Sequence, residues 1–112
     1  MEHALISVVT FQPGTADQAL WRANTELTLR LRNRPGFISH SVVRTGRSSA
    51  GAFSRWRTRA HASAAESLIS HWGKETLGPM VVSCEHHVGP VVFTVPASGA
   101  SAEGTEATLA LP

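Results

Sequence analysis

Apolar and polar positions follow two different periods in the first third of the chain. Residues Ala4–Phe11 are apolar at nearly every position, which predicts a strand that is covered on both faces. The break Gln12–Gly14 follows, and the spacing of Thr15 and Gln18 is that of a capping box at the start of a helix. We predict that this helix runs to about Arg32, because apolar residues recur at helical spacing at Leu20, Ala23, Leu27 and Leu31.

A turn and a pair of strands are predicted next. Pro35 disfavours helical backbone at the residue before it, and Gly36 readily adopts a positive φ, so the helix has to end there. The run Phe37–Thr45 predicts a strand. The segment Gly46–Gly51 is rich in small residues and predicts a hairpin connection, and Ala52–Arg57 predicts the returning strand.

The second half of the chain has a less decisive pattern. A second helix is predicted to start at Ser63 or nearer Thr58 and to end at Gly73. The segment 79–88 fits the spacing of a helix and also that of a strand, and we predict a short helix there. Val91–Val95 is then predicted as the final strand.

The order strand, helix, strand, strand, helix, strand is that of the ferredoxin-like α+β fold, a four-stranded antiparallel sheet with both helices on one face. We expect one domain, residues 1–96, and a flexible C-terminal tail, residues 97–112, made of small and acidic residues. The other sheet face is predicted to be too apolar for water, so that a second copy of the chain covers it. Its residues are Ile6, Val8, Ile38, Val42 and Phe53, or the alternating set.

Composition supports a folded domain, since 42% of the residues are hydrophobic and only 16% are charged. The single cysteine, Cys84, excludes an intramolecular disulfide and fits a reducing compartment. The N-terminus lacks the features of a signal peptide, and no apolar run is long enough for a membrane helix. We therefore expect a cytoplasmic protein with no membrane partner.

Most of the basic residues lie between Arg30 and Arg59, and this stretch contains no acidic residue, so a nucleic-acid partner has to be considered. RNA-recognition domains share the predicted element order, but they need aromatic residues in a basic, glycine-rich motif on the central strands. The predicted strands carry no such motif, and the chain has no tyrosine. We therefore expect no nucleic-acid partner.

Four features of the sequence together resemble the antibiotic biosynthesis monooxygenase family. They are ISVVTF in the first strand, RPGF at the opening of the second, Trp56 at the end of the third, and GPVVFTVP as the last strand. The resemblance covers about residues 4–96 and implies a homodimeric α/β barrel. It also implies a monooxygenase of antibiotic or pigment biosynthesis that uses no metal, flavin or haem. An anthrone-like aromatic polyketide loses a proton in an apolar cavity, and its carbanion reacts with dioxygen.

The resemblance implies a catalytic role for Trp56. The family's oxygenases also carry an asparagine where this chain has Ala52, a tyrosine near the position of His61, and an arginine on the next helix, whereas no arginine follows Arg59 here. We predict that His61 replaces the tyrosine as proton acceptor, because imidazole titrates near neutrality. His40 on the second strand is predicted as a further catalytic residue if it projects into the cavity, and the alternative is that it lies at the dimer interface. The predicted substrate-binding residues are Ser7, Val9, Phe37, Phe53 and Trp72.

No cofactor is expected. The run Cys84–His87 has metal-binding residue types, but neighbours on a helix or a strand point in different directions and do not converge on one ion. Haem-degrading proteins that resemble this family use an asparagine on the first strand and a histidine after the tryptophan. This chain has Ser7 and Glu66 at those positions, so we predict neither a metal nor a haem site.

Two other functions stay open at this point. The same cavity with an acid/base histidine suits cyclisation or isomerisation of a polyketide. The missing asparagine, tyrosine and arginine also fit a non-catalytic dimeric binding protein that has kept the barrel and lost the oxygenase site. Product analysis with and without dioxygen separates the monooxygenase from the cyclase or isomerase.

Overall fold

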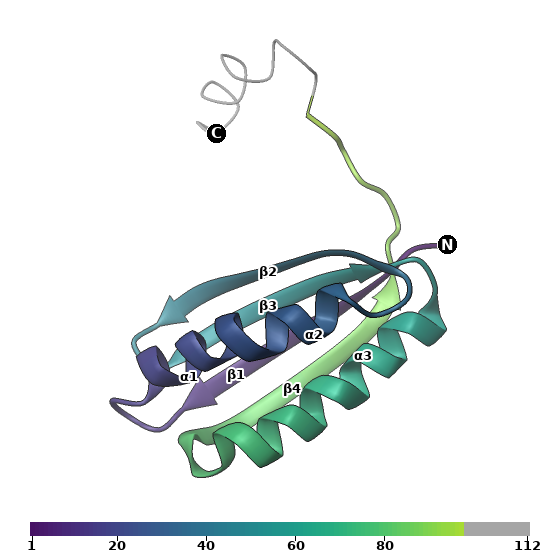
Figure 1. Ribbon diagram of the computed structural model, residues 1–112. Helices are drawn as coiled ribbons and strands as arrows, with labels where there is room; N and C mark the ends of the chain where they lie inside the picture. Colours follow the sequence, from purple (N-terminus) through teal and green to yellow (C-terminus); the bar gives the residue numbers. More distant parts are fainter. Residues whose placement is uncertain (98–112) are drawn as a thin grey trace, which may run out of the picture.

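The computed structural model describes residues 1–97, which form one antiparallel sheet with helices on one face (Figure 1). The strands are β1 (His3–Phe11), β2 (Phe37–Gly46), β3 (Ser49–Trp56) and β4 (Val81–Pro90), in the order β2-β3-β1-β4. The first helical layer consists of α1 (Ala16–Arg22), the π-helical η1 (Ala23–Leu27) and α2 (Thr28–Arg32). The second consists of α3 (Arg59–Trp72), the π-helical η2 (Gly73–Leu77) and a 3₁₀ turn, η3 (Gly78–Met80). The predicted ferredoxin-like α+β fold is confirmed.

The prediction was wrong at the last strand. Segment 79–88, predicted as a helix, contains most of β4, and Val91–Val95, predicted as the final strand, lies beyond the sheet (Figure 1). β4 pairs along the whole of β1, from Phe11 to His3, and the chain leaves the sheet after one further hydrogen bond, from the Val91 N–H to the Glu2 carbonyl at 2.9 Å. The local sequence of this segment fits the period of a helix and that of a strand, and pairing with β1 makes it a strand. The predicted tail, residues 97–112, lies outside the described residues apart from its first residue.

The helix starts and the hairpin also differ in detail. The Thr15 hydroxyl makes no capping bond and donates instead to the carbonyl of Gln12, at 2.8 Å. Of the two starts left open for the second helix, the one near Thr58 is correct, because the Thr58 hydroxyl accepts a hydrogen bond from the His61 N–H at 3.2 Å. The hairpin connection is shorter than predicted, since β3 already begins at Ser49.

The turn between α2 and β2 requires glycine. Gly36 has a φ of +80°, and a Cβ atom placed there would lie 2.1 Å from Nδ1 of His61. The Gly36 carbonyl accepts a hydrogen bond from the N–H of Arg57 at 2.9 Å, which ties the turn to the end of β3. Pro35 and Gly36 therefore end the helix as predicted and place Phe37 at the start of β2.

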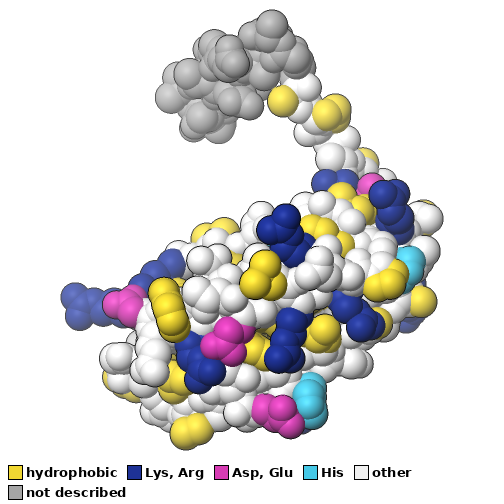
Figure 2. Space-filling model, viewed as in Figure 1, with side chains coloured by type: hydrophobic (Ala, Val, Ile, Leu, Met, Phe, Trp, Pro, Cys, Tyr) yellow, Lys and Arg dark blue, Asp and Glu magenta, His cyan; other side chains and the backbone are white. Residues whose placement is uncertain are grey.

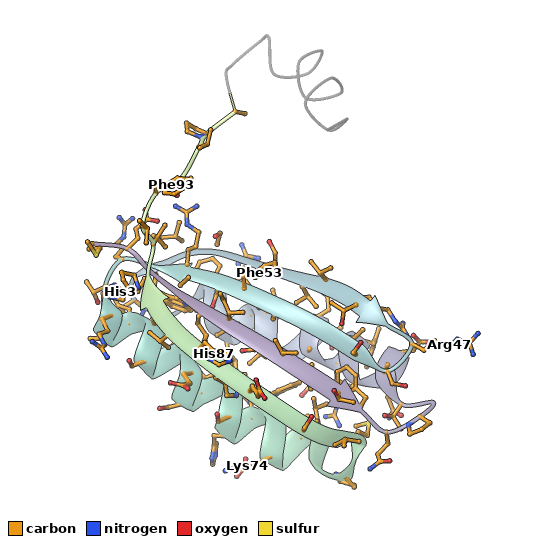
Figure 3. All side chains as sticks on the ribbon, turned by 180° about the vertical axis from the view of Figure 1, so that it is seen from behind. His3, Arg47, Phe53, Lys74, His87 and Phe93 are labelled. Carbon is orange, nitrogen blue, oxygen red and sulfur yellow. The ribbon has the colours of Figure 1, made fainter. Side chains whose placement is uncertain are left out.

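The two faces of the sheet meet different surroundings. Side chains such as Leu5 and Phe11 face the helices and are almost fully buried. The opposite side of the sheet is covered by no helix of the described residues (Figure 3). Its apolar side chains are 42–48% exposed, and we call them the outer face: Ile6, Val8, Val43 and Phe53. In a single chain, β1 is thus covered on one face only, and Val42, predicted for the outer face, lies on the helical side.

The basic residues are dispersed, and several are paired with acids. Figure 2 shows Lys and Arg side chains spread over the helical side rather than gathered in one patch. Arg22 contacts Glu26 at 2.8 Å, one turn away on the same helical layer, and Arg55 contacts Glu2 at 2.5 Å. These exposed pairs contribute little to stability. The acidic partners do, however, reduce the local positive charge around Arg22 and Arg55.

Candidate active site

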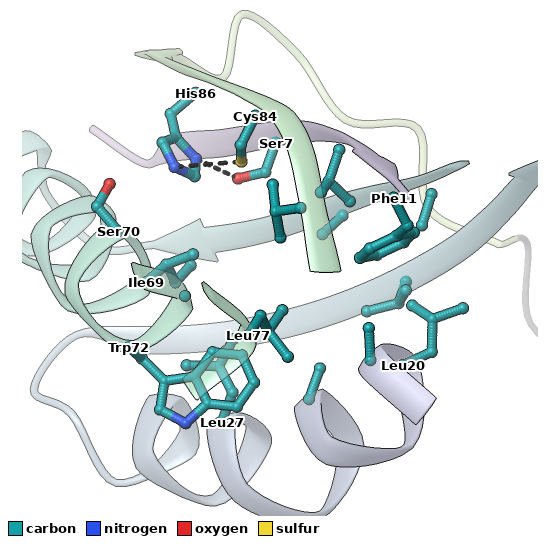
Figure 4. Close-up of a pocket in the computed structure, with 18 of the residues that line it drawn as sticks. Ser7, Phe11, Leu20, Leu27, Ile69, Ser70, Trp72, Leu77, Cys84 and His86 are labelled. Carbon is teal, nitrogen blue, oxygen red and sulfur yellow. Dashed lines mark hydrogen bonds between the residues drawn. The ribbon is translucent and has the colours of Figure 1, made fainter. Parts of the chain in front are cut away.

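A cavity of about 550 Å³ lies between the helical layers and the sheet (Figure 4). Its walls are mostly apolar, with Leu20 and Leu27 from the first helical layer and Ile69 and Leu77 from the second. The polar or ionisable side chains that line it are Ser7, His40, Ser70, Trp72, Lys74, Ser83, Cys84 and His86. Apolar walls with a few polar groups are typical of small-molecule sites of this size.

Both helical layers change to π geometry where they line the cavity. The segment η1 contributes Ala23 and Leu27, and η2 contributes Gly73, Lys74 and Leu77. A π turn places an extra residue in the helix and is frequent at functional sites. The helical side of the cavity is therefore built from the ends of regular helices, such as Leu20 and Ile69, and from the π-helical segments that follow them.

His40, on β2, is the cavity residue with an unfilled hydrogen bond. Its Nδ1 atom is buried and has no hydrogen-bond partner among the described residues. Burial lowers the pKa of His40 below its ordinary value of 6.5, so the imidazole is neutral near pH 7. Because protein atoms enclose Nδ1, a ligand in the cavity would meet the ring through its other nitrogen, Nε2. A neutral imidazole on an apolar wall has the properties of a general base.

Trp72 forms part of the wall opposite the sheet (Figure 4). Its Nε1 is buried and makes no hydrogen bond of ordinary geometry within residues 1–97. The pKa of the Glu26 carboxyl is lowered mainly by Arg22 and, to a smaller extent, by the Trp72 N–H. We therefore regard the Trp72 ring as an apolar wall of the cavity.

Ser7, Cys84 and His86 form a hydrogen-bonded cluster on two neighbouring strands (Figure 4). Nδ1 of His86 lies 2.8 Å from Oγ of Ser7, and Nε2 lies 3.5 Å from Sγ of Cys84. Burial lowers the pKa of His86, while burial and the nearby Glu85 raise the pKa of the Cys84 thiol. The imidazole and the thiol are thus both neutral near pH 7, and each nitrogen of His86 has a partner.

Half of the predicted site residues line the cavity, namely Ser7, Val9, His40 and Trp72. Trp56, Phe37, Phe53 and His61 do not. Trp56 is fully buried, and its Nε1 donates to Oγ of Ser54 at 2.9 Å. The ring of Phe37 packs edge-on against it, with 5.5 Å between ring centroids. These two aromatic residues pack against each other in the core.

The remaining two predicted residues lie further away. Phe53 belongs to the outer face, so the sheet itself separates it from the cavity. His61 lies in the first turn of α3, where its ring packs against Gly36 and its Nδ1 is 3.0 Å from Oγ1 of Thr58. His61 therefore packs against the turn that joins α2 to β2.

Sequence reasoning missed Cys84 and His86 as cavity residues. They were considered only as metal ligands, in a segment predicted to be helical. On a strand, alternate residues share a face, so these two point to the cavity while Glu85 and His87 point away.

Within residues 1–97, no group of three His, Cys, Asp or Glu side chains is arranged so that it could hold a metal ion. No helix in this part of the chain is long and apolar enough to cross a membrane.

Comparison with known proteins identifies the fold. No family model and no curated protein matches the sequence. Among solved structures, SnoaB, a cofactor-independent oxygenase from Streptomyces nogalater, is 18% identical, with a TM-score of 0.64, over 85% of this chain and 97% of its own. A candidate antibiotic biosynthesis monooxygenase from Nitrosomonas europaea is 11% identical, with a TM-score of 0.69, over 85% and 94%.

A second candidate antibiotic biosynthesis monooxygenase, from Chloroflexus aurantiacus J-10-fl, is 21% identical, with a TM-score of 0.64, over 86% of this chain and 98% of its own. Each of the three structures is matched over nearly its full length, so the similarity extends over the whole described domain. At these identities the similarity concerns the fold. The chain therefore has the fold of the antibiotic biosynthesis monooxygenase proteins.

Proposed function

We propose that this protein is a monooxygenase that needs no cofactor and that it oxidises an anthrone-like aromatic polyketide. The observation that carries the proposal is the unpaired, neutral imidazole of His40 on the wall of an apolar cavity of about 550 Å³. The shared fold with SnoaB, a cofactor-independent oxygenase, supports it.

The reaction needs one base and dioxygen. His40 takes a proton from the CH₂ carbon between the aromatic rings, and the resulting carbanion is delocalised onto the phenolic rings. The carbanion reacts with dioxygen, the peroxide formed takes the proton back, and loss of water leaves a carbonyl. In sum, CH₂ and O₂ give C=O and H₂O, so no external reductant is required. The apolar walls keep water from the reactive intermediate.

His40 is a better base than the other histidine in the cavity. Both nitrogens of His86 lie within hydrogen-bond distance of protein groups, whereas Nδ1 of His40 has no partner. The family's oxygenases also have an asparagine, a tyrosine and an arginine that are absent here. The reaction is therefore the one that the resemblance implies, and His40 of this chain is the proposed proton acceptor.

Oxygen uptake with dithranol, a simple phenolic anthrone, tests the proposal. We expect protein treated with a chelator to consume dioxygen and dithranol in equal amounts, well above the spontaneous rate, as measured with an oxygen electrode. Conversion of a substrate without oxygen uptake would favour the cyclase or isomerase alternative. Binding of dithranol with no conversion would favour the binding protein.

We also propose that two copies associate through the outer face. Its apolar side chains are 42–48% exposed in the single chain, and a contiguous apolar face of this kind usually marks an interface. Because the pattern repeats on the same face of both copies, a two-fold arrangement buries the same residues from each. The helical side, which holds the cavity, stays accessible in such a dimer.

Sedimentation tests this association. We expect the protein to sediment as a dimer and Phe53→Lys to weaken the dimer by about tenfold or more, since it buries a charge in the centre of the interface. Leu29→Lys is the matched control, because Leu29 is 53% exposed but lies on α2. A wild-type monomer, or equal effects of the two substitutions, would contradict the proposal.

A further inference from the structure

The cluster of Ser7, Cys84 and His86 has the arrangement of an activated nucleophile. Cys84 and His86 are two residues apart on β4 and point to the same side, and Ser7 lies opposite His86 in the β1–β4 ladder. All three residues therefore lie on strands of the sheet, and no loop contributes to the cluster. The base lies within hydrogen-bond distance of the thiol, and a third group orients the base, which is the general pattern of nucleophilic catalysis.

The protonation states of the cluster follow from its contacts. A neutral thiol donates a hydrogen bond, so Nε2 of His86, 3.5 Å from Sγ, acts as the acceptor. The other nitrogen, Nδ1, then carries the proton and donates to Oγ of Ser7, 2.8 Å away. Ser7 thereby holds His86 in the tautomer in which its lone pair faces the sulfur of Cys84.

The position of Cys84 gives a ligand access to the sulfur. Cys84 is exposed, yet it also lines the cavity, because β4 is an edge strand of the sheet. An aromatic ligand held between the helices and the sheet lies next to this thiol. Glu85 and His87 point to the opposite side of the sheet, where they lie 3.5 Å from each other, so they act on the cluster only through their charge.

We propose that Cys84 is a nucleophile that adds covalently to conjugated carbonyl compounds, such as quinones, bound in the cavity, with His86 as the base and Ser7 as its positioning residue. The sulfur forms a bond to the β carbon of the C=C–C=O system, and the π electrons move to the carbonyl oxygen. His86 takes the thiol proton and passes it to that oxygen. In a quinone, the hydrogen on the attacked carbon then moves as a proton to the second carbonyl oxygen, which gives a hydroquinone thioether, and no other oxidant or reductant is needed.

Anaerobic reaction with 1,4-naphthoquinone tests this proposal, and because it requires no dioxygen, its outcome is independent of the proposed oxygenation. Intact-protein mass spectrometry follows the addition of one quinone to the chain's only cysteine. We expect the rate to saturate with quinone concentration, since binding in the cavity precedes addition, and 2-naphthol to compete. His86→Gln should lower the saturating rate by about tenfold or more, and Ser7→Ala by a smaller factor.

His87→Gln is the matched control, because it removes a neighbouring imidazole from the opposite side of the strand and should leave the rate unchanged. Circular dichroism establishes that each variant is folded, and Ser7→Ala provides an independent test if His86→Gln does not fold. A rate that rises linearly with quinone concentration and equals that of free cysteine would overturn the proposal. Equal rates for wild type, His86→Gln and Ser7→Ala would also overturn it.

Discussion

His40→Gln is expected to lower the rate of dithranol oxidation by about 10²-fold or more, because positioned acid/base groups contribute about this factor. The substitution keeps a polar side chain of similar reach but removes the group that accepts the proton. His40 is the one cavity imidazole with a buried, unpaired nitrogen in the described part of the chain. An oxygen electrode measures the effect, and circular dichroism establishes that the variant is folded.

The pH dependence of the wild-type rate provides a second test of the role of His40. Burial lowers the pKa of His40, so the basic form is present above that lowered value and is lost as the pH falls through it. We therefore expect full activity near pH 7 and a decline centred below the ordinary histidine pKa of 6.5. His61→Gln is the matched control, because His61 lies outside the cavity; a loss equal to that of His40→Gln would contradict the assignment.

Trp56→Ala is expected to lower the free energy of unfolding by about 3–5 kcal/mol, the usual cost of removing a large buried aromatic side chain. Trp56 is fully buried, packs against Phe37 and donates to Ser54, so the substitution leaves a cavity and an unpaired hydroxyl. Urea denaturation measures the change.

Trp21→Ala is the control for this effect, since the same side chain is 65% exposed there and should cost less than about 1 kcal/mol. Equal losses at the two positions would contradict the core role of Trp56. The resemblance implies a catalytic role for this tryptophan, whereas the structure places it in the core beneath the start of β2, outside the cavity.

The fold could be predicted from sequence wherever a local signal determines the backbone. Pro35 and Gly36 end a helix by their own backbone limits, and the structure shows the end there, with φ of Gly36 at +80°. The strand β4 could not be predicted in the same way, because Val81–Val88 satisfies both periods. Its conformation depends on pairing with β1, which is distant in the sequence.

The candidate site was predictable only in part, for the same reason. His40 was predicted from its residue type, because alternation with Val42 shows that the two share a face of the strand but not which face that is. Cys84 and His86 share a side only once their segment is known to be a strand. Phe53 was predicted both for the outer face and for substrate binding, and its pairing with Ile6 places it on the outer face, away from the cavity.

Isotope labelling tests most directly whether the cavity performs cofactor-independent oxygenation. Chelator-treated protein is incubated with dithranol under ¹⁸O₂, and the product is analysed by mass spectrometry against a sample without protein. We expect one ¹⁸O atom in the new carbonyl of the product, formed rapidly by the wild type and at the background rate by His40→Gln. A product that carries oxygen from water, or an activity that disappears with the chelator and returns with added metal, would contradict the proposed function.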